Sequence, residues 1–85
     1  MDKIIKVGHR GASGYEPENT LLAFKKAIEI GADMIELDVR RCKSGELVVI
    51  HDETVNRTTN GKGEVSEKTL TELKGLEMEK GERII

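Results

Sequence analysis

Two carboxylates stand two residues apart in an otherwise mostly apolar stretch of the chain, Asp33–Val39. The alternation of residue types in this stretch predicts a β-strand in which Glu36 and Asp38 point to the same side. Neighbouring carboxylates repel each other and are costly to remove from water. A bound divalent cation offsets that cost, and hard cations such as Mg²⁺ or Ca²⁺ prefer oxygen ligands. The stretch therefore predicts a metal site, with a solvated edge strand as the alternative.

The only two histidines of the chain each follow a predicted strand. His9 comes after Lys3–Val7, and His51 comes after Glu46–Ile50. Because histidine exchanges a proton near neutral pH, the pair suits general acid and base chemistry, although each taken singly is also an ordinary loop histidine. Arg10, beside the first histidine, offers a planar fork for phosphate or carboxylate; the alternative is a solvated charge.

The elements that must position these residues are short and closely connected. Apolar spacing predicts a helix over residues 20–30, capped by Asn19 and ended by Gly31 in a left-handed conformation. The resulting strand–helix–strand order makes the two predicted strands parallel. In parallel α/β folds the carboxyl ends of the strands carry ligands and catalysis. We therefore expect the histidines, the arginine and the two carboxylates to gather at that end.

The second half of the chain predicts a hairpin followed by a polar loop and a short helix. Glu46–Ile50 is expected to pair back on the strand that carries the carboxylates. Asp52 then either orients His51 or begins the following turn, and the turn is the simpler interpretation. Further along, Thr69–Glu72 matches a capping box, which predicts a short helix that stops at Gly75.

Composition excludes several classes of protein. With 14 basic and 16 acidic residues and only two aromatics, the chain lacks the features of a nucleic-acid-binding surface. No stretch approaches the ~20 apolar residues of a membrane span, and the first residues lack the apolar run of a signal peptide. Cys42 is the single cysteine, so no intrachain disulfide can form, and a cytoplasmic location is expected.

Five motifs, taken in order, resemble those of the glycerophosphodiester phosphodiesterase family. They are His9–Gly11, Pro17–Thr20 with Ala23 and Phe24, Glu36–Val39, Val49–Asp52 and Arg57–Gly63. The resemblance implies an α/β fold made of the opening βα units of a TIM-type (β/α)₈ barrel, truncated, with a small insertion beginning at residues 53–68. It also implies an enzyme that hydrolyses small glycerophosphodiesters to an alcohol and glycerol 3-phosphate with the help of a divalent cation.

By the same resemblance, each candidate residue has a role. Glu36 and Asp38 are metal ligands for Mg²⁺ or Ca²⁺. His9 and His51 form the acid/base pair, and Arg10 binds the phosphate.

The length of the chain motivates the main alternative. A (β/α)₈ barrel takes about 250 residues, so this chain corresponds to about a third of one. The resemblance implies a third metal carboxylate beyond Ile85. Two parallel strands and one helix leave apolar surface uncovered. The alternative hypothesis is therefore a catalytically incomplete barrel fragment that self-associates or complements a partner piece. A related barrel phospholipase acting on larger lipids is less favoured, because the sequence shows no amphipathic membrane helix.

Overall fold

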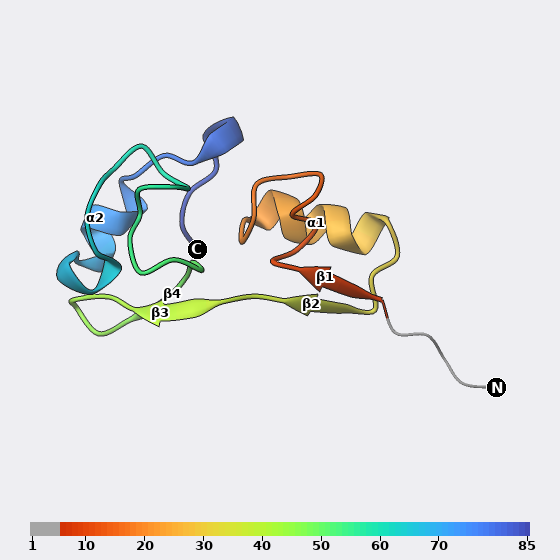
Figure 1. The fold of residues 1–85 in the computed structure, drawn as a ribbon, viewed down its shortest axis with the longest axis horizontal. Coiled ribbons are helices and arrows are strands. Elements are labelled where there is room, and N and C mark those ends of the chain that lie inside the picture. The colour runs from red at the N-terminus through yellow and green to blue at the C-terminus, as the bar shows by residue number, and fades with distance from the viewer. Residues whose placement is uncertain (1–5) are drawn as a thin grey trace.

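A computed structural model describes residues 6–85 of the chain, and its elements fall into two regions. The strands form two separate two-stranded sheets, β1–β2 and β3–β4. Figure 1 shows an N-terminal region (residues 6–36), in which α1 lies over β1 and β2, beside a C-terminal region (residues 39–85) built on β3 and β4. In chain order the elements are β1 (Val7–His9), α1 (Leu21–Glu29), β2 (Met34–Glu36), β3 (Val39–Arg41), β4 (Leu47–Val49), the 3₁₀ helix η1 (Val65–Glu67), α2 (Leu70–Lys74) and the 3₁₀ helix η2 (Glu79–Gly81).

The first sheet pairs β1 with β2 in parallel, as the strand–helix–strand order predicts. Val7 stands opposite Met34, and His9 stands opposite Glu36. The predicted first strand began at Lys3, and residues 3–5 lie outside the described part of the chain. The described strand runs on to His9, so this histidine ends the strand rather than following it.

Small residues bring α1 close to the β1 strand and the turn that follows it. Ala23 and Ala27 are fully buried in the helix. A side-chain carbon built on Gly8 would stand 3.1 Å from the Ala27 methyl, and one on Gly11 would stand 2.8 Å from Ala23. Gly11 also has a φ of +78°, which disfavours any residue with a Cβ. The close approach of the backbone therefore depends on glycine and alanine.

The helix cap is Thr20, so the prediction that Asn19 caps α1 is wrong. The Thr20 hydroxyl accepts a hydrogen bond from the Ala23 N–H at 3.1 Å and donates one to the Pro17 carbonyl at 2.7 Å. Both residue types can cap a helix. Asn19 instead takes a positive φ of 54°, a conformation that asparagine tolerates, and its buried side chain turns towards Asp38, which lies between β2 and β3. At the other end of the helix, Gly31 has the predicted left-handed conformation, with a φ of +86°.

The predicted single strand Asp33–Val39 is divided in two, so that prediction is also wrong. β2 ends at Glu36 and β3 begins at Val39, because the chain changes its pairing partner at Leu37 and Asp38. β3 pairs with β4 in the predicted antiparallel hairpin, with Val39 opposite Val49.

The C-terminal region encloses the apolar core. Eight residues form one buried cluster: Cys42, Val48, Ile50, Val55, Val65, Leu73, Met78 and Ile84. The predicted capping box of α2 is confirmed, since the Thr69 hydroxyl accepts from the Glu72 N–H and the Glu72 carboxylate accepts from the Thr69 N–H. Gly75 is the C-cap residue, as predicted.

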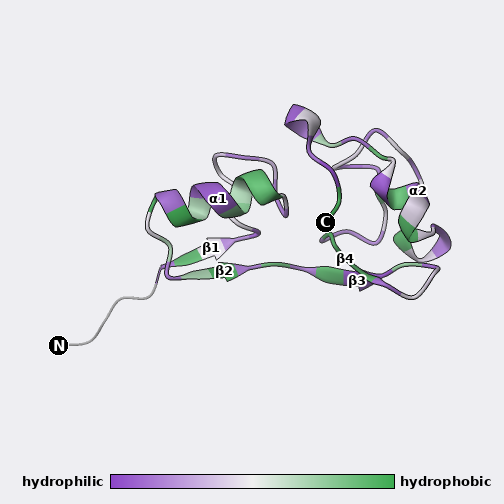
Figure 2. Ribbon diagram, turned by 180° about the vertical axis from the view of Figure 1, so that it is seen from behind, coloured by the Kyte–Doolittle hydropathy of each residue, from purple (hydrophilic) through white to green (hydrophobic). Residues whose placement is uncertain are grey.

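The strand surface away from the helices carries exposed apolar side chains. Figure 1 and Figure 2 show both helices on one side of the strands, and in Figure 2 β1 and β3 include hydrophobic, green segments. The exposed apolar residues of the strands are Val7, Met34, Val39 and Leu47, each about half exposed or more. This confirms the predicted uncovered surface.

Candidate functional site

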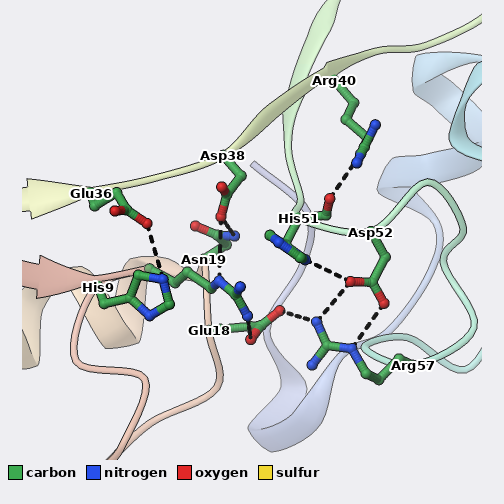
Figure 3. A network of polar contacts seen from close by, with 10 residues as sticks. His9, Glu18, Asn19, Glu36, Asp38, Arg40, His51, Asp52 and Arg57 are labelled. Carbon is green, nitrogen blue, oxygen red and sulfur yellow. Dashed lines mark hydrogen bonds and ion pairs between the residues drawn. The ribbon is translucent and has the colours of Figure 1, made fainter.

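Two of the predicted site residues meet at the ends of the parallel strands. His9 ends β1 and Glu36 ends β2, and the register places them opposite each other. The His9 Nε2 lies 3.1 Å from the Glu36 Oε1, and both side chains are at least half exposed. Since side chains alternate along a strand, His9 shares its face with Val7, and Glu36 shares its face with Met34. The pair, whose contact is drawn in Figure 3, thus stands on the same face as the exposed Val7 and Met34.

A second pair joins Arg10 to Asp38. The Arg10 Nε lies 3.5 Å from the Asp38 Oδ2, while the Arg10 Nη1 donates a hydrogen bond of 2.9 Å to the Glu18 Oε2. Asn19 donates a hydrogen bond of 3.1 Å to the same Asp38 oxygen. Arg10 is therefore held between two carboxylates and is not a freely solvated charge. Figure 3 shows Glu36 and Asp38 projecting to the same side of the chain, as predicted.

His51 joins this group from the end of β4. The N–H of Ile50 donates to the Asp38 carbonyl at 2.9 Å, which ties the strand end to the carboxylate-bearing segment. The Nε of Arg40 donates to the His51 carbonyl at 2.9 Å. The His51 Nδ1 lies 2.9 Å from the Asp52 Oδ1. Asp52 thus contacts the histidine ring, which is the geometry that the alternative of an orienting role requires.

Arg57 connects the two regions through a second set of carboxylates. Its Nε and Nη2 donate to the two Asp52 oxygens at 2.8 and 3.0 Å, and its Nη2 also donates to the Glu18 carboxylate. These hydrogen bonds from Arg57, followed by the one with His51, hold the pKa of Asp52 well below its usual range. Burial raises the pKa of Glu18, but the hydrogen bonds from Arg57 and Arg10 outweigh it and lower the pKa overall. Both carboxylates are therefore ionised at neutral pH.

The site supplies oxygen ligands of the type that a hard divalent cation prefers, but too few of them to complete its coordination shell. Glu36 and Asp38 supply carboxylates, and the buried Oδ1 of Asn19 has no hydrogen-bond partner. Within residues 6–85, however, no group of three or more His, Cys, Asp or Glu side chains is arranged to hold a metal ion. A complete coordination shell requires ligands in addition to these two carboxylates.

Sequence reasoning missed three residues of this network: Glu18, Asn19 and Arg57. Two of them lie in Pro17–Thr20, where only the capping function was considered. Arg57 falls in the predicted polar loop, and nothing local connects it with Glu18, 39 residues earlier. The sequence marked these segments in one way only: Pro17–Thr20 and Arg57–Gly63 are both among the five motifs that resemble the family.

Comparison with known proteins identifies relatives for nearly the whole chain. The model of the family described as "Glycerophosphoryl diester phosphodiesterase family" matches residues 9–84. A glycerophosphodiester phosphodiesterase of Caldanaerobacter subterraneus is 60% identical over 75 residues, which are 88% of this chain and 31% of that protein. One from Bacillus subtilis is 51% identical over 89% of this chain and 26% of its own length. The chain thus spans under a third of these relatives.

Solved structures agree with the described fold. The crystal structure of a glycerophosphodiester phosphodiesterase from Agrobacterium tumefaciens gives a TM-score of 0.88 at 45% identity, covering 96% of this chain and 38% of that one. An Oleispira antarctica phosphodiesterase, solved in complex with the product sn-glycerol-3-phosphate, gives 0.85 at 39% identity, covering 88% of this chain and 30% of the other. Among the described residues, no helix has the length and apolar character needed to cross a membrane.

Proposed function

We infer, from the premise that the chain belongs to the glycerophosphoryl diester phosphodiesterase family, that it carries part of an active site for glycerophosphodiester hydrolysis. The products would be an alcohol and glycerol 3-phosphate. The Oleispira antarctica relative with bound sn-glycerol-3-phosphate supports this choice of product. Because the chain spans under a third of its curated relatives, the activity belongs to a protein that has the remaining segments as well.

One observation carries the proposal: His9, Arg10, Glu36 and Asp38 meet where the parallel strands end. His9 contacts Glu36, and Arg10 contacts Asp38. The carboxyl ends of parallel strands are where α/β enzymes bind and convert their substrates. A cluster of titratable and phosphate-binding groups at that edge suits a phosphodiester better than a neutral ligand.

The side chains divide the work of hydrolysis. Arg10, held by Glu18, presents its guanidinium to the phosphate oxygens. His9 and His51 exchange protons with the attacking and leaving oxygens, one as base and the other as acid. Glu36 and Asp38 would hold a divalent cation, Mg²⁺ or Ca²⁺. When bound, such a cation supplies Lewis-acid polarisation of a phosphoryl oxygen.

The proposal includes the architecture around the site. Val7, Met34, Val39 and Leu47 form an uncovered apolar surface, and His9 and Glu36 stand on the same face. In a (β/α)₈ barrel one face of the strands is covered by helices, and the other face points into the barrel interior. We therefore assign the uncovered face to the interior of a barrel completed by further strands. A cytoplasmic location is part of the proposal, since it would keep the buried Cys42 reduced.

A chimeric protein tests the activity directly. This chain replaces the segment that it matches in the Caldanaerobacter subterraneus relative, and release of glycerol 3-phosphate from glycerophosphocholine is measured with Mg²⁺, Ca²⁺ or a chelator. We expect turnover that the chelator abolishes. Substituting His51→Gln should lower kcat by about 10²–10⁴-fold, the usual contribution of a general acid or base.

A charge-removing double variant and a matched control test the proposed metal ligands. The double variant Glu36→Gln with Asp38→Asn keeps the shape of both side chains but removes the charges. It should lose turnover and should no longer bind Mn²⁺, used as a probe with electron paramagnetic resonance. The control variant Glu67→Gln changes an exposed carboxylate in η1, away from Glu36 and Asp38, and should affect neither turnover nor Mn²⁺ binding. Wild-type turnover in the double variant would overturn the proposed mechanism.

The uncovered surface also favours a second candidate, in which the 85-residue chain associates with itself or with a complementary barrel piece. Exposed strand residues such as Val7, Met34 and Leu47 motivate it. Analytical ultracentrifugation of the chain alone should then show concentration-dependent mass. A monomer at all concentrations would refute self-association and leave the enzymatic proposal intact.

A further inference from the structure

Arg57 donates hydrogen bonds to the Asp52 carboxylate, which in turn contacts the His51 ring. Two guanidinium nitrogens donate to the two oxygens of Asp52, at 2.8 and 3.0 Å. A planar guanidinium matched to a carboxylate in this way fixes orientation as well as charge. The Oδ1 of Asp52 is also 2.9 Å from the His51 Nδ1. Arg57 therefore determines where the oxygen that faces His51 can lie.

Arg57 is itself held from the other region of the molecule. Its Nη2 donates to Glu18, whose second oxygen accepts from Arg10 at 2.9 Å. Glu18 is mostly buried, with a side chain 13% exposed, whereas Arg57 is about half exposed. Figure 3 shows the Arg57 guanidinium between Glu18 and Asp52, so the buried carboxylate gives the exposed arginine a second anchor.

The charge state of Asp52 decides which nitrogen of His51 carries the proton. An ionised carboxylate only accepts hydrogen bonds, so a neutral histidine facing it must donate from Nδ1. The other nitrogen, Nε2, then has a free lone pair. The tautomer of a histidine is set by the hydrogen bond that its second nitrogen makes.

We propose that Arg57 is a positioning residue that acts through Asp52 to hold His51 with its proton on Nδ1, which leaves Nε2 to exchange protons with the substrate. The proton exchange with the substrate rests on the proposed function, whereas the tautomer of His51 does not. This role gives a function to the polar segment after β4, which places Arg57 within hydrogen-bonding distance of Asp52. A purely structural role, in which Arg57 only ties two loops together, predicts no change in the His51 tautomer.

The chain offers a direct measurement, because it has only two histidines. Long-range ¹H–¹⁵N correlation spectra of the ¹⁵N-labelled chain report which ring nitrogen is protonated, and the His51→Gln variant assigns the signals. Above the titration of the ring, we expect His51 to be protonated on Nδ1. In Asp52→Asn the amide can donate to Nδ1, so the proton should move to Nε2.

Arg57→Gln is the decisive variant. We expect it to convert His51 from the Nδ1-protonated form to a mixture of tautomers, while Arg57→Lys, which keeps the charge but not the fork, should give a smaller change. Arg41→Gln removes an exposed arginine of β3 and should leave the tautomer unchanged. Dispersed amide signals of Val48 and Val55, which are buried in the core, confirm that each variant is folded.

A folded Arg57→Gln variant whose His51 keeps the wild-type tautomer would overturn the positioning role. In the chimeric protein the same variant should lower kcat by about 10-fold or more and leave KM nearly unchanged, because it alters proton transfer rather than substrate contact. Absence of turnover in the unmodified chimera would count against the proposed function alone, since the tautomer is measured without any substrate.

Discussion

The two regions of the molecule are held together by different means. In the C-terminal region eight apolar or sulfur-containing residues are buried in one cluster. In the N-terminal region, contact depends on glycine and alanine, and larger residues such as Leu21 and Met34 are exposed. Three of the five predicted site residues, His9, Arg10 and Glu36, belong to the N-terminal region. The candidate chemistry therefore stands mainly on the region with the smaller core.

The largest effect is expected in the apolar cluster. Leu73 is fully buried, so Leu73→Ala removes side-chain contacts and leaves a cavity. We expect the free energy of unfolding to fall by about 3 kcal/mol, within the range for buried leucines. Urea denaturation followed by circular dichroism measures it.

The matched control for this variant is Leu21→Ala in α1, where the leucine is 58% exposed. Its expected effect is within about 0.5 kcal/mol. Equal losses for the two leucines would mean that the N-terminal region buries Leu21, for example against a second copy, and the contrast between the regions would disappear.

The next effect tests the close packing of α1. Gly11→Ala places a Cβ about 2.8 Å from the Ala23 backbone and puts alanine at a positive φ. We expect a local cost of about 2 kcal/mol from strain and overpacking. Hydrogen exchange of the α1 amides should then be at least 10-fold faster, since about 1.4 kcal/mol corresponds to tenfold.

Gly14→Ala provides the comparison, because a Cβ at Gly14 meets no atom within 4 Å. Amides of α1 should exchange at the wild-type rate in this variant, and amides of β4 should be unaffected in both. If Gly11→Ala also accelerated exchange in β4, the two regions would unfold as one unit.

The smallest effect concerns the ion pairs between the regions. The pKa of Glu18 lies below its ordinary value of 4.5, and that of Asp52 lies below 3.8. Carboxylates with lowered pKa values stabilise the folded state above their unfolded pKa, and this contribution is lost as the pH falls through the folded pKa. Below about pH 4 this contribution to stability should therefore begin to decline, by under about 1 kcal/mol in total, because the Arg57 side chain is about half exposed. The contacts of Arg57 should break only at lower pH, as each carboxylate passes its own folded pKa.

The free energy of unfolding, measured by urea denaturation from pH 6 to pH 2, follows this loss, and the Arg57 Nε–H signal in NMR spectra reports the release of Asp52. Glu18→Gln should remove the part of the pH dependence that belongs to Glu18. The core amides of the C-terminal region should keep their chemical shifts at a pH where Arg57 has already been released. Simultaneous changes in both would contradict the separation of the regions.

Local patterns predicted most of the elements. The hairpin of β3 and β4, the capping box at Thr69 and the left-handed Gly31 each depend on a few neighbouring residues, and the structure confirms all three. Their signals are strong because turn chemistry and capping are decided within a few residues.

Features that depend on distant partners could not be predicted in the same way. Asn19 and Thr20 are both suitable caps, and the choice is made by the contact of Asn19 with Asp38, 19 residues away. The break after Glu36 has no glycine or proline to mark it, since it comes from a change of pairing strand. Nothing near Arg57 in the sequence indicates its contact with Glu18, 39 residues away. Motif resemblance marked these segments without giving their contacts.

The backbone of Arg10 sets stability against the proposed function at one position. Its φ of 54° lies in the left-handed region, where a residue with a long side chain is strained by about 1–3 kcal/mol. A search for thermostable variants should therefore select glycine or asparagine at position 10, and each of these would remove the guanidinium that lies between Glu18 and Asp38. Selection for turnover should return arginine. Directed evolution with alternating heat and activity screens would thus find no single best residue there.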